Sequence, residues 1–388
     1  MQRESLLGHT DPLLEEFYPE PGEDAEEEEL EDQMGAMNTH RLDPQRELHS
    51  LAFDNKDKDY RWVKVIGQGA FGVVFQAYNL KSLETVAIKK VYQDPKCRNR
   101  EFTIVIDLDH RNVIKVHDYF FTKHEENELD VYLNIVMDFY PTTLNKILRY
   151  YHKMGKQFPP MLLKLLLYQL LRALAYIRGK GILHRDIKPQ NILVDTKDYR
   201  LILCDFGSAK IFSREEESIA YICSRFYRSP ELILGEKNYS HEVDVWAAGC
   251  VVGEMILGEP LFCGNNNKEQ FLRIVNILGP PIEADLQAMG YSHRIAMPKF
   301  TPLGLKRKLG PGVEPLLLDL MSKLLAYNPK TRIAPFHALA HPYFDELRKH
   351  RILVNGRSTG ELFDFSREEI GGDEKLLSRL FPVWHKSN

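Results

Sequence analysis

The chain has 388 residues, of which 44% are hydrophobic, and a formal net charge of −4 at pH 7. A chain of this length can bury an ample core and form two domains or lobes, so its composition is typical of a large soluble enzyme. It lacks the concentrated basic stripe of a nucleic-acid-binding protein, and no nucleic-acid partner is expected.

A few features of the sequence bear on cellular location. The longest apolar segment, from Met161 to Ile177, contains Lys164, Gln169 and Arg172, and is therefore too polar for a membrane span. The first residues show neither a signal pattern nor a Met-Gly start, so we expect no secretion and no membrane partner. The five cysteines and 14 histidines form no short paired spacing, which predicts free thiols and no structural metal. The expected location is the cytoplasm, with the nucleus as a second compartment.

Acidic residues are concentrated at the N-terminus. Residues 1–59 hold 18 acids and 5 bases, a net charge of −13, whereas the remainder holds 46 bases against 37 acids. The run Glu23–Asp32 cannot bury enough apolar surface to fold, so residues 1–59 are predicted to form a disordered acidic tail. Two interpretations stay open: a solvated tail, or a tail that competes for a basic pocket of the body.

Residues 60–140 alternate strand-like runs with turns and one helix, which predicts a small, mainly antiparallel β lobe. The strands are expected at Trp62–Ile66, Val73–Tyr78, Thr85–Val91, Ile114–Phe121 and Val131–Met137. Residues 141–344 show mostly helical apolar spacing, and residues 345–388 are expected to pack back on this body. The expected fold class is therefore α+β, with a small, mainly β N-lobe and a larger, mainly α C-lobe.

A glycine-rich turn, Gly67–Gly72, lies between the first two predicted strands. Glycines at this spacing let a hairpin backbone approach phosphate groups without Cβ clashes. Dinucleotide-binding folds use similar glycines between a strand and a helix, so the position between two strands disfavours that alternative.

Two charged residues follow where they can form a pair. Lys89 ends the run Val86–Lys89, a position from which a strand lysine can contact the α- and β-phosphates of a nucleotide. Glu101 opens a helical segment and is the expected ion-pair partner. The alternative, a solvated strand lysine, is disfavoured by the motifs that come later in the chain.

Two polar motifs carry the chemistry. Leu183–Asn191 contains the sequence His-Arg-Asp-Ile-Lys-Pro-Gln-Asn, and Asp205-Phe206-Gly207 follows after a strand-like run. Phosphoryl transfer from ATP needs one carboxylate near the attacking hydroxyl, and a second carboxylate and an amide on magnesium. Either motif alone is a weak signal, but their combination with the glycine turn and the lysine strand is very specific.

Over Tyr60–Phe344 these motifs resemble the eukaryotic protein kinases, which implies the bilobal protein-kinase fold, ATP and Mg²⁺. Within them the chain is similar to the glycogen synthase kinase 3 family of the CMGC group, which implies a serine/threonine protein kinase. The segments that carry this closer resemblance are Val91–Asp94, Asn99–Glu101, Cys204–Lys210, Ser218–Glu231, Asp244–Cys250, Phe344–Arg348 and Asn355–Arg357.

The resemblance implies a role for each matched residue. The catalytic set is Asp186, Lys188, Lys89 and Glu101. Asp186 would accept or orient the hydroxyl proton, and Lys188 would steady the γ-phosphoryl group as its charge develops. Lysine at position 188 is also more similar to serine/threonine than to tyrosine kinases. Asn191 and Asp205 would hold Mg²⁺, because this ion prefers oxygen ligands.

The nucleotide pocket implied by the resemblance has Met137 as the gatekeeper at its back and the join Asp138–Tyr140 as the hinge for adenine. Its expected lining is Ile66, Gly67, Gln68, Gly69, Gly72, Val74, Ala87, Lys89, Met137, Asp138, Tyr140, Gln190, Asn191, Leu193, Cys204 and Asp205. Cys204 is expected to face the floor of the pocket in a packing role. Asp244 and the pair Glu231–Arg332 are expected to be buried structural charges.

Substrate choice follows from the same resemblance. Arg100, Arg185 and Lys210 would converge beside the activation segment and bind a phosphate already on the substrate, since guanidinium groups suit phosphate. The implied target is a Ser/Thr four residues N-terminal to an existing phosphoserine or phosphothreonine, so the expected partners are phosphoprimed proteins. Many kinases use an arginine like Arg185 for their own phosphorylated loop, which is the alternative. Tyr221 is the expected autophosphorylated residue.

The chain departs from the animal enzymes at two places. Ser5 lacks the preceding basic residues of their N-terminal pseudosubstrate, so inhibition by its phosphorylation is not expected. The segment Gly290–Arg294 differs from the family pattern beside the surface where scaffold peptides dock in animals. Scaffold proteins are therefore an expected partner class whose docking surface departs from that of the animal enzymes.

Two alternatives to this function stay open. A pseudokinase scaffold would lose the lysine, the catalytic aspartate or a magnesium ligand, and all of these are present. Another proline-directed CMGC kinase of the cyclin-dependent type would carry Pro-Ser-Thr-Ala-Ile-Arg-Glu up to Glu101, and Asp94–Arg100 does not match that pattern.

Overall fold

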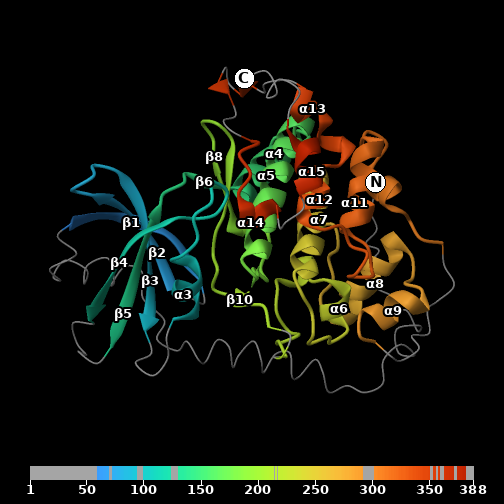
Figure 1. Cartoon of the computed structure of the whole chain (residues 1–388), viewed down its shortest axis with the longest axis horizontal. Coiled ribbons are helices and arrows are strands. Elements are labelled where there is room, and N and C mark those ends of the chain that lie inside the picture. Colours follow the sequence, from blue (N-terminus) through green and yellow to red (C-terminus); the bar gives the residue numbers. More distant parts are fainter. Residues whose placement is uncertain are drawn as a thin grey trace, which may run out of the picture.

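The computed structural model describes residues 59–69, 72–93, 99–123, 130–213, 215, 217–291, 301–349, 353–354, 357–358, 362–370 and 374–381. Several sequence predictions fall outside these residues. They concern the acidic tail (except Asp59, which is described), two residues of the glycine turn (Ala70 and Phe71), Asp94, Ser292–Arg294 and Asn355–Gly356. Figure 1 shows two lobes, with a sheet on one side and a bundle of helices on the other.

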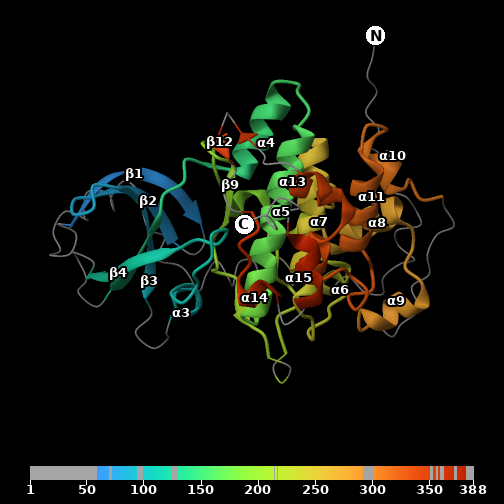
Figure 2. The same cartoon turned by 45° about the horizontal axis from the view of Figure 1, so that its top comes forward.

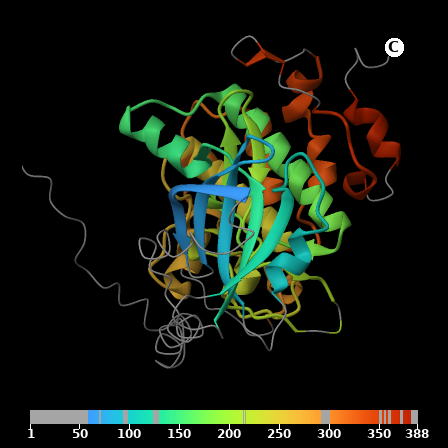
Figure 3. The ribbon, with the colours of Figure 1, turned by 90° about the vertical axis from the view of Figure 1, so that its left-hand side faces the viewer.

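The smaller lobe is a five-stranded antiparallel sheet in the order β1-β2-β3-β5-β4, together with one helix. Its elements are β1 (Tyr60–Gly69), β2 (Gly72–Asn79), β3 (Thr85–Gln93), α3 (Arg100–Val105), β4 (Val116–Lys123) and β5 (Val131–Asp138). The register places Val74 opposite Lys89, and Ala87 opposite Met137. Consecutive strands pair β1 with β2, β2 with β3 and β4 with β5, whereas β3 reaches its neighbour β5 through α3 and β4. Figure 3 views this sheet in front of the helical lobe.

The fourth predicted strand, Ile114–Phe121, was placed too early, because the strand begins at Val116. Ile114 instead donates its backbone N–H to the carbonyl of Leu203, and Val113 forms an isolated bridge with the same residue. Ile114 is therefore tied to the larger lobe, a long-range contact that the local apolar pattern does not reveal.

The larger lobe is mainly helical, with short strands around the catalytic loop. Its first part is β6 (Thr142–Thr143), α4 (Leu144–Lys153), α5 (Pro160–Gly179), β7 (Ile182–Leu183), β8 (Ile192–Asp195), β9 (Arg200–Leu203) and β10 (Lys210–Ile211). Its second part is α6 (Pro230–Ile233), α7 (Glu242–Leu257), α8 (Asn267–Leu278), α9 (Glu283–Ala288), α10 (Leu305–Leu309), α11 (Pro315–Leu324) and α12 (Pro335–Leu339). This sheet-and-helix division confirms the predicted α+β, two-lobed fold.

α5 is the central helix of the larger lobe. Pro160 at its first position suits a helix start, and apolar side chains on all its faces are typical of a buried helix. Among the described residues it is the one helix whose length and apolar content would suffice to cross a membrane. The share of its apolar window buried inside the fold is 89%, as expected for a core helix.

The C-terminal residues pack on α5. The elements here are α13 (Asp345–Lys349), β11 (Leu353–Val354), β12 (Arg357–Ser358), α14 (Arg367–Ile370) and α15 (Glu374–Leu380). α14 lies against α5, which Figure 1 and Figure 2 both show. Leu362, Phe363 and Leu380 belong to the main hydrophobic core, so this extension is part of the packed body.

Candidate active site

A cavity of about 460 Å³ opens between the two lobes. Every residue that the sequence assigned to the nucleotide pocket lines it, from Ile66 of β1 to Asp205 after β9. The sequence missed further lining residues: Val105, Ile114, Ile135, Phe139, Thr143, Asn145, Lys146, Arg149 and Phe206. Four of these are the N-cap Thr143 and three residues in the first two turns of α4, and only their position soon after the hinge could have indicated them.

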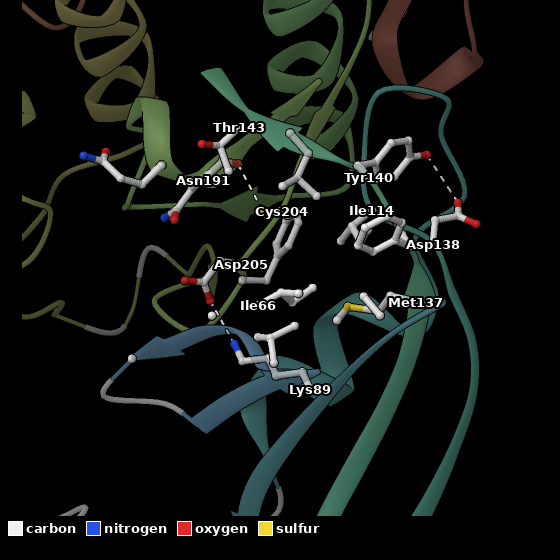
Figure 4. A pocket seen from close by; sticks show the side chains of 18 of the residues that line it. Ile66, Lys89, Ile114, Met137, Asp138, Tyr140, Thr143, Asn191, Cys204 and Asp205 are labelled. Atoms are coloured by element: carbon white, nitrogen blue, oxygen red, sulfur yellow. Dashed lines mark hydrogen bonds and ion pairs between the residues drawn. The ribbon is translucent and has the colours of Figure 1, made fainter. Parts of the chain in front are cut away.

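Lys89 joins the two lobes through two ion pairs. Its Nζ lies 2.7 Å from Oε1 of Glu101 and 2.9 Å from Oδ1 of Asp205, as Figure 4 shows for Asp205. Burial opposes the charge of Lys89, but the two carboxylates outweigh it and raise the pKa of this ammonium. Burial likewise acts to raise the pKa of Asp205, yet Lys89 reverses the effect and lowers it. Both groups are therefore held in their charged forms.

The hinge carries a smaller polar network. Nε2 of His117 lies 2.6 Å from Oδ1 of Asp138, and the hydroxyl of Tyr140 donates to Oδ2 of Asp138 at 3.4 Å. Asp138, Phe139 and Tyr140 all line the cavity. The Asp138 side chain thus connects His117 of β4 to Tyr140 of the hinge.

Asp186 is held by three neighbouring side chains. Its Oδ2 lies 2.7 Å from Nζ of Lys188 and accepts a hydrogen bond from Nδ2 of Asn191 at 2.8 Å. Its Oδ1 accepts from the hydroxyl of Ser224 at 2.8 Å, and that hydroxyl accepts from Nζ of Lys188 at 3.0 Å. The structure therefore brings the predicted Asp186, Lys188 and Asn191 together, and adds Ser224, which the sequence analysis did not single out.

The loop around Asp186 has an unusual backbone that is fixed by Asp244. Arg185 has a φ of 64°, a conformation that costs a non-glycine residue free energy. The buried carboxylate of Asp244 accepts the backbone N–H groups of His184 and Arg185, each at 2.8 Å. The expected structural role of Asp244 agrees with this geometry, because two hydrogen bonds stabilise the strained turn.

His184 connects the loop to the strand before Asp205. Its Nδ1 accepts the backbone N–H of Asp186 at 3.2 Å, and its Nε2 lies 3.0 Å from the carbonyl oxygen of Cys204. Because a carbonyl can only accept, Nε2 carries the proton of a neutral ring. Cys204 lines the cavity and is held by its own contact of 3.3 Å to the carbonyl of Asn191. Burial raises the pKa of this thiol.

The second structural pair is buried in the larger lobe. Arg332 makes two hydrogen bonds to the carboxylate of Glu231, at 2.7 and 3.0 Å. Both side chains are at most 2% exposed, so the fork-to-fork contact is fully shielded from water. The pair is thus a buried structural contact of the larger lobe, which agrees with the role expected from the sequence.

The three predicted phosphate-binding cations lie in adjacent elements. Arg100 begins α3, which contacts β10, and Lys210 in β10 pairs with Leu183, two residues before Arg185. The guanidinium of Arg185 donates to the carbonyl of Ser208 at 2.7 Å and to the hydroxyl of Tyr239 at 3.0 Å. Among the described residues, neither Arg100 nor Arg185 forms an ion pair with a carboxylate.

Arg228 stabilises the activation segment through hydrogen bonds to its backbone. Its guanidinium donates to the carbonyl oxygens of Ile222 and Cys223, each at 3.1 Å, and lies 4.3 Å from the ring centroid of Tyr221. Cys223 has a φ of 71°, so the chain turns sharply there. The predicted autophosphorylation residue Tyr221 is thus half-buried against a cation.

The donor set fits a nucleotide with a divalent metal. Asp205 supplies a charged carboxylate and Asn191 an amide oxygen, and both line the cavity beside Lys89. No cluster of three or more His, Cys, Asp or Glu side chains suited to a metal occurs among the described residues. A metal here would accordingly take its remaining ligands from phosphate and water, which is how Mg²⁺ is usually bound.

The comparison with known families agrees with this geometry. The family model of the protein kinase domain matches residues 60–344, which is most of the chain. The matched range contains both lobes, the cavity and the loop around Asp186. The chain therefore belongs to the protein kinase family, of the eukaryotic type.

Proposed function

We propose that this protein kinase transfers the γ-phosphoryl group of ATP to serine and threonine hydroxyls, and prefers substrates already phosphorylated four residues C-terminal to the target. The observation that carries the proposal is the contact of Asp186 and Lys188 with one serine hydroxyl, that of Ser224. An aliphatic hydroxyl thus fits within hydrogen-bond distance of both the Asp186 carboxylate and the Lys188 ammonium, as proton transfer from a serine or threonine acceptor requires.

The mechanism assigns each residue a role. Asp186 accepts the proton of the attacking hydroxyl as its oxygen bonds to the γ-phosphorus and the bond to the β-phosphate oxygen breaks. Lys188 stabilises the negative charge on the transferred group, and Asn191 orients the carboxylate through its 2.8 Å hydrogen bond. Lys89, held by Glu101, contacts the phosphates. Mg²⁺ bound by Asn191 and Asp205 would supply charge neutralisation on the phosphate oxygens.

The preference for primed substrates is supported by Arg100, Arg185 and Lys210. Arg100 begins α3, which contacts β10, and Lys210 lies in β10. Arg185 follows two residues after Leu183, the β7 partner of Lys210. Three cations in one place repel one another unless an anion lies between them, and guanidinium groups match a phosphate geometrically. A phosphate on the substrate would supply that anion.

The test compares peptides that differ in the acceptor (Ser, Thr or Tyr) and in the residue four positions later (phosphoserine or serine). Arg100→Ala should lower kcat/KM on the primed serine peptide roughly 10-fold or more, the loss expected for one charge-assisted contact. The kcat/KM of this variant on the unprimed peptide should stay close to that of the wild type. Arg61→Ala, an exposed arginine of β1, is the matched control and should change neither rate.

Two results would contradict parts of the proposal. Equal loss on primed and unprimed peptides would mean that Arg100 supports the fold and does not bind the substrate. Phosphorylation of the tyrosine peptide in preference to serine would overturn the assigned acceptor.

A further inference from the structure

The α4 side of the nucleotide cavity carries two positive charges that the mechanism does not use. Lys146 and Arg149 line the cavity together with Thr143 and Asn145. Both are exposed, and their spacing of three residues places them on one face of the helix. They therefore present a paired cationic edge to the mouth of the cavity.

These charges are not balanced within the described part of the chain. Neither side chain has a hydrogen-bond or ion-pair partner among the described residues. The carboxylates that line the cavity are engaged elsewhere, since Lys89 pairs with Glu101 and Asp205, and His117 pairs with Asp138. An anionic ligand is the missing complement.

The start of α4 adds to the positive field. Thr143 caps the helix by accepting the backbone N–H of Lys146 at 3.2 Å. The remaining N–H groups of the first turn have no partner inside the helix and carry the positive end of its dipole. The dipole reinforces the two side-chain charges at the same place.

The triphosphate of ATP does not supply the anion that would pair with Lys146 and Arg149. In Figure 4, Thr143 and Lys89 lie on opposite sides of the cavity. A triphosphate bound at Lys89 and Asp205 would leave α4 beside the uncharged sugar. The anion that meets Lys146 and Arg149 must then come from another molecule.

The direction of the protein substrate indicates what that anion is. In Figure 1, α4 lies in the upper part of the larger lobe and β10 in its lower part. If the primed phosphate, C-terminal to the target, binds at Arg185 and Lys210, residues N-terminal to the target extend towards α4. This step depends on the proposed function.

We propose that Lys146 and Arg149 select protein substrates with acidic residues on the N-terminal side of the target serine or threonine, the residue that accepts the γ-phosphoryl group. Carboxylates of the substrate replace the missing partners of the two cations. Upstream basic residues are rejected by the same charges.

The test uses serine peptides, primed four residues after the target, with aspartate, alanine or lysine at one of positions two to five before it. Wild type should show kcat/KM about threefold to tenfold higher for aspartate than for alanine at the best position, as expected for exposed charge pairs. The double variant Lys146→Glu/Arg149→Glu should favour lysine over aspartate. The matched control, Lys153→Glu/Lys156→Glu, changes exposed lysines that do not line the cavity and should keep the aspartate preference.

The possible failures are distinguishable. If wild type phosphorylates serine but shows no upstream acidic preference, or if the double variant keeps it, the inference is wrong. A rise confined to the KM for ATP would assign the cations to the nucleotide and also overturn it. If no serine peptide is phosphorylated, the proposed function fails. Binding of a fluorescent acidic peptide, measured by anisotropy at low and high salt, then still decides the role of Lys146 and Arg149.

Discussion

At the scale of single residues, Asp186 is defined by what surrounds it. Its carboxylate contacts an ammonium, an amide and a hydroxyl at 2.7–2.8 Å, so both oxygens are oriented before a substrate binds. Such preorganisation is useful because a group that is already in place needs no rearrangement in the transition state. The residue does not line the nucleotide cavity, which separates its role from nucleotide binding.

We therefore expect Asp186→Asn to lower kcat roughly 100- to 10,000-fold, the usual contribution of a positioned proton acceptor. The affinity for ATP, measured by titration calorimetry, should stay nearly unchanged, since the lost interaction forms mainly in the transition state. Asp107→Asn, which alters an exposed carboxylate outside the cavity, serves as the control. An equal loss of ATP binding in Asp186→Asn would show that the residue has a different role.

At the scale of elements, the glycines of the β1–β2 hairpin are not equivalent. Gly72 has a φ of 136°, and a Cβ added there would lie 2.2 Å from the backbone carbonyl oxygen of Lys90 on β3. A Cβ on Gly69 would meet nothing within 4 Å. Only Gly72 is required by the packing of the sheet itself; Gly69 leaves space that a phosphate can use.

Gly72→Ala should accordingly destabilise the protein by about 1–3 kcal/mol, the usual cost of a strained backbone conformation or an overpacked site. Gly69→Ala, the matched control, should change the unfolding free energy by less than about 1 kcal/mol. Urea unfolding without nucleotide measures both, so that effects on ATP binding do not enter. Equal destabilisation by the two variants would show that the nearby Lys90 carbonyl does not restrict the side chain at position 72.

At the scale of the whole molecule, the C-terminal extension is fastened to the central helix by a buried charge network. Arg172 of α5 donates to Oε1 of Glu369 at 2.7 Å and to Oδ1 of Asp364 at 2.7 Å. The Glu369 side chain is fully buried, and its Oε2 lies 3.3 Å from Nε2 of His110, which precedes β4. Glu369 of the C-terminal extension thus connects the loop between α3 and β4, through His110, to the central helix α5, through Arg172.

The pH dependence of stability follows from Glu369. Burial alone would raise its pKa, but the hydrogen bonds and charges of His110 and Arg172 lower it from 4.5 to about 2. A lowered pKa stabilises the folded state above the unfolded pKa, and this contribution is lost as pH falls from about 4.5 towards 2. Glu369→Gln should reduce the unfolding free energy by about 2–4 kcal/mol at pH 7. The difference from wild type should shrink below pH 4.5.

The neighbouring pair provides the control. Glu368 lies 3.2 Å from Nζ of Lys180, and both side chains are about one-third exposed. Such exposed ion pairs contribute little to folding stability, so Glu368→Gln should lower the free energy of unfolding by less than about 1 kcal/mol. Urea unfolding at pH 7, 5 and 3.5 compares the two variants. If the cost of Glu369→Gln is constant over this range, the carboxylate is not ionised in the folded protein.

Much of the site could be predicted from the sequence, because its residues lie in short motifs. Asp186, Lys188 and Asn191 fall within six residues, and one tight loop brings them together. The strands of the N-lobe follow from alternating apolar residues, which make one face of a sheet buried. The pairing of Lys89 with Glu101 also follows, since a strand and the next helix are close along the chain.

Other features depend on residues that are distant in the sequence, and only the tertiary structure decided them. Ser224 reaches Asp186 across 38 positions, and Glu369 reaches Arg172 across 197. The exposed cations Lys146 and Arg149 look like ordinary helix-surface residues until the fold places them at the cavity. The physical reason is that local patterns record which face of an element is buried, whereas long-range contacts depend on how whole elements pack. The sequence by itself thus determined the chemistry near each motif, and packing between lobes and termini determined which further side chains surround it.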